Sequence, residues 1–343
     1  MRVKIIRGDA LHPLIMHGKM RRTMKKKRCL VLIVLLVCIF VGYSIKNRAE
    51  KTKIDLNSDT PLKFGATYMT MNNPYFIALN ESVREVVEAN GDILITRDPA
   101  QSQERQNAQI QEMIEEGVVA IFANPVDWEK ITPALQACQE AGVAVINVDT
   151  DVKHKEYVIS VIQSDNYQAG VQCAQDMMTK MDSARIVIMN HYNIKSTTQR
   201  VQGFLDTIEG YPQYEVVKEV STTSELEVAM KMMKRILKTD LEFDVVLGGN
   251  DPTALGALAA LQLNHVKNRV MIYGIDGSPD AKTMIQQGYL EGTSAQRPIE
   301  IGRTAAETAY TYLQGEKVDK NITVAVTLIT KDNLSEFDMD GWQ

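Results

Sequence analysis

The feature of this sequence that most limits its fold is a regular alternation between short apolar runs and amphipathic stretches. From residue 62 onward, runs rich in β-branched residues alternate with segments of helical period, such as NAQIQEMIEEGV at 107–118. Continuous apolar strands that alternate with helices are typical of parallel sheets covered by helices on both faces. The pattern therefore predicts an α/β fold.

The number of predicted strands indicates more than one sheet. Eleven strands exceed an open sheet of ordinary size, and roughly 280 residues exceed one typical domain. We therefore predict two doubly wound parallel-sheet lobes, with a break near Ser164 and Asp165, where a new helical pattern begins. The predicted strands are 62–69, 92–96, 118–123, 143–148, 157–162, 185–190, 214–220, 243–248, 270–275, 290–295 and 322–329.

Charge is distributed unevenly along the chain. Residues 1–53 carry 14 Lys/Arg and 2 Asp/Glu, which leaves 24 Lys/Arg and 41 Asp/Glu for the remainder. An acidic body repels phosphate backbones, so this balance argues against nucleic-acid binding.

The basic residues flank an apolar segment. Residues 29–45, CLVLIVLLVCIFVGYSI, contain no charge and are close to the length that crosses a bilayer. Because Lys/Arg stay on the cytoplasmic side, we predict a basic cytoplasmic N-terminus at 1–28, a transmembrane anchor at 29–45 and a polar linker at 46–61, with the body outside the cytoplasm. A cleaved signal segment, giving a secreted protein, is the alternative. Whether Met20 or Met24 is the true start is also left open.

Four strand-like runs end in Asn or Asp with Pro close behind. They are MNNPYF at 71–76, ANPVDW at 123–128, GNDPTA at 249–254 and DGSPDA at 276–281. Pro suits the first helical turn, and Asn or Asp can cap it. In open parallel sheets, ligands bind beyond the carboxyl ends of strands, where helices begin. Two junctions lie in each half, so we predict that all four converge on one cleft; capping alone is the alternative.

Sequence signatures of catalysis and cofactor binding are missing. The chain has no G-x-G-x-x-G after its first strand, no phosphate-binding G-x-x-x-x-G-K-[ST] loop and no G-x-S-x-G elbow, and its five histidines are scattered. We therefore predict neither an enzyme nor a cofactor or metal site. Cys138 and Cys173 fall on different predicted helices, and the sequence leaves open whether they pair.

Eight motifs carry a resemblance to a known family. From about 62 to 330 the chain resembles the ribose-type periplasmic sugar-binding proteins, which are related to the lactose-repressor family. The resemblance implies two lobes joined by three hinge crossings, with lobe I at 62–164 plus 297–325 and lobe II at 165–296 plus 326–343. The motifs are MNNPYF, FANPVDW, INVDTD, SDNYQAG, QRVQGF, GGNDPTALGAL, YGIDGSPD and TSAQRP.

The resemblance also implies a set of ligand-binding residues. Tyr75 and Phe76 would stack on a sugar ring, Asp149 would accept hydroxyl protons, and Arg200 would donate to ring and hydroxyl oxygens. The full set is Asn73, Tyr75, Phe76, Asn124, Asp149, Arg200, Asn250, Asp276 and Gln296.

Two departures from the ribose binders put ribose itself in doubt. Thr150 stands where they have Arg, and Ser224 stands where they have an aromatic ring. Asp151 and Trp128 are considered as replacement contacts. The implied ligand is accordingly a monosaccharide or small polyol of unspecified identity.

The predicted function is capture of such a ligand outside the cytoplasm and its delivery to an ABC importer. The alternative is a membrane-tethered sugar sensor that signals to a histidine kinase. Partners would then be the ABC permease or the sensor kinase, with the membrane contacted through the N-terminal helix. For Arg200→Ala and Asn250→Ala we expect loss of ligand binding with little change in the unliganded fold.

Overall fold

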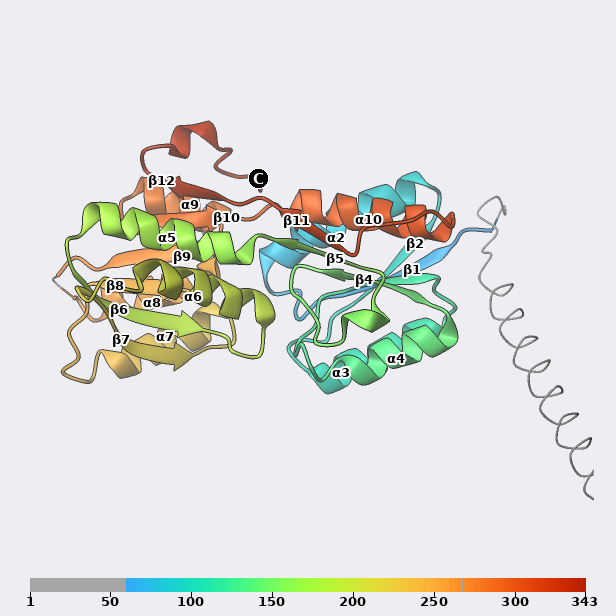
Figure 1. Cartoon of the computed structure of the whole chain (residues 1–343), viewed down its shortest axis with the longest axis horizontal. Coiled ribbons are helices and arrows are strands. Elements are labelled where there is room, and N and C mark those ends of the chain that lie inside the picture. Colours follow the sequence, from blue (N-terminus) through green and yellow to red (C-terminus); the bar gives the residue numbers. More distant parts are fainter. Residues whose placement is uncertain (1–59, 267) are drawn as a thin grey trace, which may run out of the picture. The chain divides into compact units, whose positions relative to one another are not determined.

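The computed structural model describes residues 60–266 and 268–343 (Figure 1). The predicted segments 1–28 and 29–45, and nearly all of 46–61, lie outside the described residues. Within the part of the chain that the structure describes, no helix is long and apolar enough to cross a membrane.

The first lobe is a six-stranded parallel sheet in the order β11-β5-β4-β3-β1-β2. Four helices and the short η1 (Lys155–Tyr157) belong to it. Its strands are β1 (Lys63–Thr67), β2 (Ile93–Arg97), β3 (Ala120–Ala123), β4 (Ala144–Val148), β5 (Ser160–Ser164) and β11 (Asn321–Val324). Its helices are α2 (Pro74–Ala89), α3 (Gln103–Glu115), α4 (Thr132–Ala141) and α10 (Pro298–Leu313).

The second lobe is a six-stranded sheet in the order β12-β10-β9-β8-β6-β7. All neighbours are parallel except β12, which runs antiparallel to β10. Its strands are β6 (Ala184–Asn190), β7 (Tyr214–Ser221), β8 (Val245–Gly248), β9 (Met271–Asp276), β10 (Gly292–Ala295) and β12 (Thr327–Thr330). Its helices are α5 (Asn166–Lys180), α6 (Lys195–Ile208), α7 (Leu226–Ile236), α8 (Asp251–Leu263), α9 (Pro279–Gln286) and the short η2 (Leu334–Glu336).

The central strands of both sheets, such as β3, β4 and β8, are buried on both faces, which explains why they are almost entirely apolar. In the first sheet, Phe122 packs in the cluster with α2 and α10, and its neighbour Ile121 packs with α3 and α4 (Figure 1). In the second sheet, Val187 packs with α7, α8 and α9, whereas Ile188 packs with α5 and α6. The predicted α/β class with two parallel-sheet lobes is confirmed.

The chain passes between the two sheets three times: after β5, after β10, and between β11 and β12. The last passage corrects one predicted strand. Residues 322–329 form two strands because Val324 pairs with Ser164 in the first sheet, whereas Thr327 pairs with Ala295 in the second. The sequence hides this break, since each half carries a buried apolar residue, Val324 in the first lobe and Ile329 in the second. The exact lobe boundaries drawn from the sequence stay a prediction.

Three of the four Asn/Asp-Pro junctions are helix starts. Asn73 caps α2 by accepting a hydrogen bond from Tyr75 N at 3.0 Å, and Asn250 caps α8 through Thr253 N at 3.1 Å. At the third, Ser278 rather than Asp276 caps α9. The Asp276 carboxylate is thereby left for other contacts.

The junction at Asn124 differs from the prediction, because no helix begins there. Asp127 Oδ1 instead accepts hydrogen bonds from the backbone N–H groups of Glu129 and Lys130, each at 3.0 Å. This turn delays the start of α4 to Thr132.

The two cysteines of the described chain are both free and buried, Cys138 on α4 and Cys173 on α5. Burial raises the pKa of the Cys138 thiol to about 12. Each therefore serves as a small apolar side chain in a separate core cluster.

Candidate ligand-binding site

A pocket of about 700 Å³ is lined by residues of both lobes. Most of its polar residues follow strands or begin helices, which is where the sequence predicted a site. Of the nine predicted residues, only Asn124 is absent from the lining. The other eight line it: Asn73, Tyr75, Phe76, Asp149, Arg200, Asn250, Asp276 and Gln296.

Asn124 lies behind the pocket and holds a residue that lines it. Its Nδ2 donates to Asp149 Oδ2 at 2.8 Å, and its Oδ1 accepts from Met69 N at 3.1 Å. Asp149 has φ 67°, a left-handed conformation that most side chains avoid. Asn124 is therefore placed as a positioning residue that fixes the strained Asp149, rather than as part of the lining that was predicted.

Arg200 is the central cation of the pocket and is almost fully buried. Its Nε donates to Asn166 Oδ1 at 2.9 Å, and its Nη1 donates to the carbonyl of Gly249 at 2.8 Å. The same Nη1 lies 3.7 Å from Asp276 Oδ1. These contacts hold the guanidinium in one orientation at the edge of the cavity.

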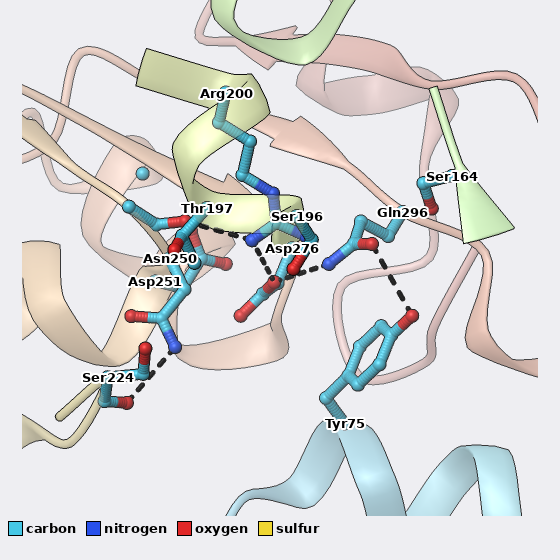
Figure 2. Close-up of polar contacts among 12 residues, drawn as sticks. Tyr75, Ser164, Ser196, Thr197, Arg200, Ser224, Asn250, Asp251, Asp276 and Gln296 are labelled. Atoms are coloured by element: carbon cyan, nitrogen blue, oxygen red, sulfur yellow. Dashed lines mark hydrogen bonds and ion pairs between the residues drawn. The ribbon is translucent and has the colours of Figure 1, made fainter. Parts of the chain in front are cut away.

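A chain of polar contacts joins the two lobes across the pocket (Figure 2). Tyr75 on α2 donates its hydroxyl to Gln296 Oε1 at 3.4 Å, and Gln296 Nε2 donates to Asp276 Oδ1 at 2.7 Å. Asp276 in turn faces Arg200. The pocket thus brings side chains separated by more than 200 positions into one network.

Asn250 combines a capping role with a place in the lining. Its Oδ1 accepts from Thr253 N and from Thr253 Oγ1, the latter at 2.6 Å. Its Nδ2 donates to Ser224 O at 3.1 Å (Figure 2). Ser224, also left-handed with φ 62°, lines the pocket without offering a ring.

The site holds three buried carboxyl groups and one guanidinium. Burial raises the pKa of Asp149, and the guanidinium of Arg200, the nearby Tyr75 hydroxyl and the Asn124 amide oppose that rise. Burial, together with the nearby Asp251, raises the pKa of Asp276 well above its ordinary value. Carboxyl groups therefore outnumber cations in the interior of the site, and the raised pKa of Asp149 and Asp276 shows that negative charge is disfavoured there.

Asp251 lies just outside the lining and is held by its own donors. Its Oδ1 accepts from Thr293 Oγ1 at 2.6 Å, and its Oδ2 accepts from Ser278 N at 2.8 Å. Burial nevertheless raises its pKa. Because both oxygens are engaged, Asp251 supports the loop around Asp276 and adds to its negative surroundings.

The aromatic pair of the α2 start belongs both to the core and to the pocket. The Tyr75 and Phe76 rings meet edge to face at 5.3 Å, and Phe76 stacks on Tyr68 at 5.8 Å. Both are buried, and both line the cavity.

The two residues suggested as replacement contacts lie outside the pocket lining. Neither Asp151 nor Trp128 lines the pocket: Asp151 Oδ2 pairs with Lys155 Nζ at 2.5 Å, and the Trp128 ring lies beneath Lys195 Nζ. Thr150, which stands where ribose binders have Arg, accepts a hydrogen bond from Ser196 N at 2.9 Å. It thereby joins the lobes directly.

Sequence reasoning missed Ser196, Thr197 and Trp342, which also line the pocket. Ser196 and Thr197 precede Arg200 by four and three residues on α6, so helical spacing predicts that they share its face. Trp342 has no such signal, because it lies at the chain end outside every motif.

Two glycines set the position of Arg200 by letting α5 and α6 approach closely. An added Cβ at Gly170 would lie 1.8 Å from the Arg200 carbonyl oxygen, and one at Gly203 would lie 2.0 Å from the Tyr167 carbonyl oxygen. The helices therefore touch backbone to backbone, and the α6 turn that carries Arg200 has one allowed position.

We expect Gly170→Ala to lower the free energy of unfolding by about 1–3 kcal/mol, because the helices must separate. Ligand binding should weaken with it, since the guanidinium moves. Urea unfolding followed by circular dichroism measures the first effect. Gln175→Ala, at an exposed position of the same helix, is the matched control and should stay within about 0.5 kcal/mol. Equal stability of the two variants would contradict the close contact.

The fold and the site define a bilobed solute-binding protein, with polar side chains of both lobes around one pocket. Residues 64–317 match the family model described as periplasmic binding protein domain, and the chain belongs to this family. The predicted family resemblance is confirmed.

Named relatives agree with this assignment. The ribose import binding protein of Bacillus subtilis (strain 168) is 26% identical over 308 residues, covering 89% of this chain and 99% of that protein. Its counterpart from Escherichia coli (strain K12) is 29% identical over 265 residues, covering 76% and 88%. A solved ABC transporter solute-binding protein from Mycobacterium smegmatis, with bound glycerol, superimposes with a TM-score of 0.76 at 27% identity, covering 81% and 96%. These relatives are solute-binding proteins rather than enzymes.

Proposed function

We propose that this protein captures a small sugar or polyol between its two lobes, outside the cytoplasm, and delivers it to an ABC importer. The observation that carries the proposal is the convergence of Asp149, Arg200, Asn250 and Asp276 on one pocket beside two aromatic rings. The relatives named for ribose import and the relative with bound glycerol support the same ligand class.

The chemistry of the lining suits a hydroxylated guest. Ionised carboxylates only accept hydrogen bonds, a guanidinium only donates, and amides do both. A sugar hydroxyl can meet all three, while its C–H face packs on the rings of Tyr75 and Phe76. A guest that leaves one buried group unpaired loses about 1–3 kcal/mol at that position. Specificity follows from the number of such groups.

The charge of the site further limits the class of ligand that can bind. Asp149 and Asp276 line the pocket, with Asp251 behind them, and Arg200 is their one cation in the lining. A ligand carboxylate or phosphate would enter an interior in which burial already raises the pKa of Asp149 and Asp276, so that negative charge is disfavoured. We therefore propose a ligand that is neutral at pH 7.

Import is favoured over sensing by the names of the relatives, two of which are import binding proteins. The described residues supply no observation in favour of a histidine kinase partner. The N-terminal membrane tether stays a prediction.

A thermal-shift screen tests the proposal. We expect at least one of D-ribose, xylitol and myo-inositol to raise the melting temperature of the purified protein, because a ligand at 100 times its Kd stabilises the folded state by about 2.7 kcal/mol. D-glucuronate and D-ribose 5-phosphate should give no shift. Asn250→Ala, which removes one lining amide, should reduce the shift. A shift produced by the anionic sugars alone would contradict the proposal.

A further inference from the structure

The C-terminal segment beyond β12, residues 331–343, packs against both lobes. Phe337 and Met339 pack on the core cluster of the second lobe, which contains residues of α7, α8 and α9. Trp342 packs instead against the core cluster of the first lobe, which contains residues of α2 and α10. In Figure 1 this segment is the red stretch that runs from β12 through η2 to the C-terminus. We call residues 331–343 the C-terminal arm.

A buried lysine holds the arm in place. Lys282 of α9 is fully buried, and its Nζ donates to the Gly341 carbonyl at 2.6 Å and to the Asp338 carbonyl. Within the arm, Asp340 N donates to Asp338 Oδ1 at 3.1 Å. A buried ammonium is costly unless it is hydrogen-bonded. Because these partners are backbone carbonyls of the arm, Lys282 and the arm depend on each other.

The arm places an aromatic ring in the pocket wall. Trp342 lines the cavity, and its ring meets that of Tyr75 edge to face at 5.7 Å, with an interplanar angle of 78°. On the second lobe, Ser224 lines the cavity and offers no ring. The chain end supplies a ring to the cavity instead.

We propose that the C-terminal arm is a third wall of the binding site, in which Trp342 packs on the C–H face of a bound sugar or polyol and Lys282 positions it. This inference rests on the proposed sugar-binding function. The ring supplies apolar area to the ligand, and the Lys282 contacts hold that ring while the ligand binds. Because the arm also packs on both lobes, its docking depends on the lobes being together.

Titration calorimetry on four variants of the whole protein tests the proposal. It measures the affinity of each variant for D-ribose, xylitol and myo-inositol. For each of the three that binds the wild type, Trp342→Ala should weaken binding about tenfold or more, and Trp342→Phe should weaken it less. Lys282→Met should also weaken binding about tenfold, although Trp342 is retained. Tyr289→Ala, which removes an exposed ring after α9, should leave the affinity within about twofold.

Fluorescence supplies a second readout, because the chain has only two tryptophans, Trp128 and Trp342. In the Trp128→Phe variant, emission of Trp342 should change as the sugar saturates the site, and acrylamide quenching should fall. Unchanged emission and quenching at saturation would overturn the proposal, even where Trp342→Ala does not fold. So would wild-type affinity in Trp342→Ala. If none of the three sugars binds the wild type, the sugar-binding function itself fails, and this inference fails with it.

Discussion

Arg200→Ala is expected to abolish ligand binding and also to lower the free energy of unfolding by about 3 kcal/mol or more. The sequence alone suggested that only binding would change. The structure alters this expectation, because the guanidinium is buried and bonded to Asn166 and to the carbonyl of Gly249. Removing one partner of a buried charge pair leaves the other uncompensated, which typically costs about 3–5 kcal/mol. Here the uncompensated group is Asp276.

Two comparisons separate the causes of this loss. Arg185→Ala removes an arginine from the exposed pair with Glu242 and should change stability by less than about 1 kcal/mol. The double variant Arg200→Met, Asp276→Asn removes both charges and should recover part of the lost stability without recovering ligand binding. Urea unfolding and titration with the best sugar of the screen measure the two effects. A stable, non-binding Arg200→Ala would show that the guanidinium has no structural role.

Asp276→Asn is expected to have opposite effects on stability and on binding. The substitution removes a buried carboxylate that lies near Asp251 and Asp149, so the unliganded protein should become more stable at pH 7. Arg200 is not left uncompensated, because the carboxyl groups of Asp149 and Asp251 remain beside it. The amide oxygen still accepts from Gln296. Ligand affinity should fall about 10- to 100-fold, because a charged acceptor for sugar hydroxyls, worth about 1.5–3 kcal/mol, is lost.

The pH dependence of stability distinguishes this explanation from simple repacking. The pKa of Asp276 is raised in the folded protein, so the folded state binds more protons than the unfolded state above about pH 3.9, the ordinary Asp value. Below that pH Asp276 is protonated in both states and does not affect stability. As the pH rises further, the free energy of unfolding falls until the pH passes the pKa of Asp276 in the folded protein. The advantage of Asp276→Asn should grow over the same range and then level off.

Urea unfolding of wild type and variant between pH 4 and pH 8 measures this difference. The exposed Asp240→Asn is the matched control and should give a curve parallel to that of the wild type. A stability difference that stays constant with pH would show that the charge of Asp276 is not its cause.

The capping residues show which parts of the site the local sequence can predict. Asn73 and Asn250 follow strands and precede helices, so their sequence context fixes both their caps and their position at the strand ends. Arg200 and Asp276 were predicted because their motifs, QRVQGF and YGIDGSPD, resemble those of the family. For these residues, the local sequence was sufficient to predict that the side chain lines the pocket.

Asn124 shows where this reasoning stops. It has the same sequence signature as the other junctions, but the turn formed by Asp127 keeps its side chain behind Asp149. The break between β11 and β12 is another case, because an unbroken strand-like run does not reveal that its two halves belong to different sheets. In both cases, the position of the residues depends on contacts with segments that are distant in the sequence.

The sequence by itself determined the α/β class and the two lobes, since strand period and helix caps are local properties, and the family resemblance of its motifs supplied eight of the residues that line the pocket. Only the tertiary structure decided that Arg200 meets Asp276 and that the arm held by Lys282 brings Trp342 against Tyr75. The physical reason is that hydrogen bonds and packing between distant segments depend on distances through space, which a sequence does not contain.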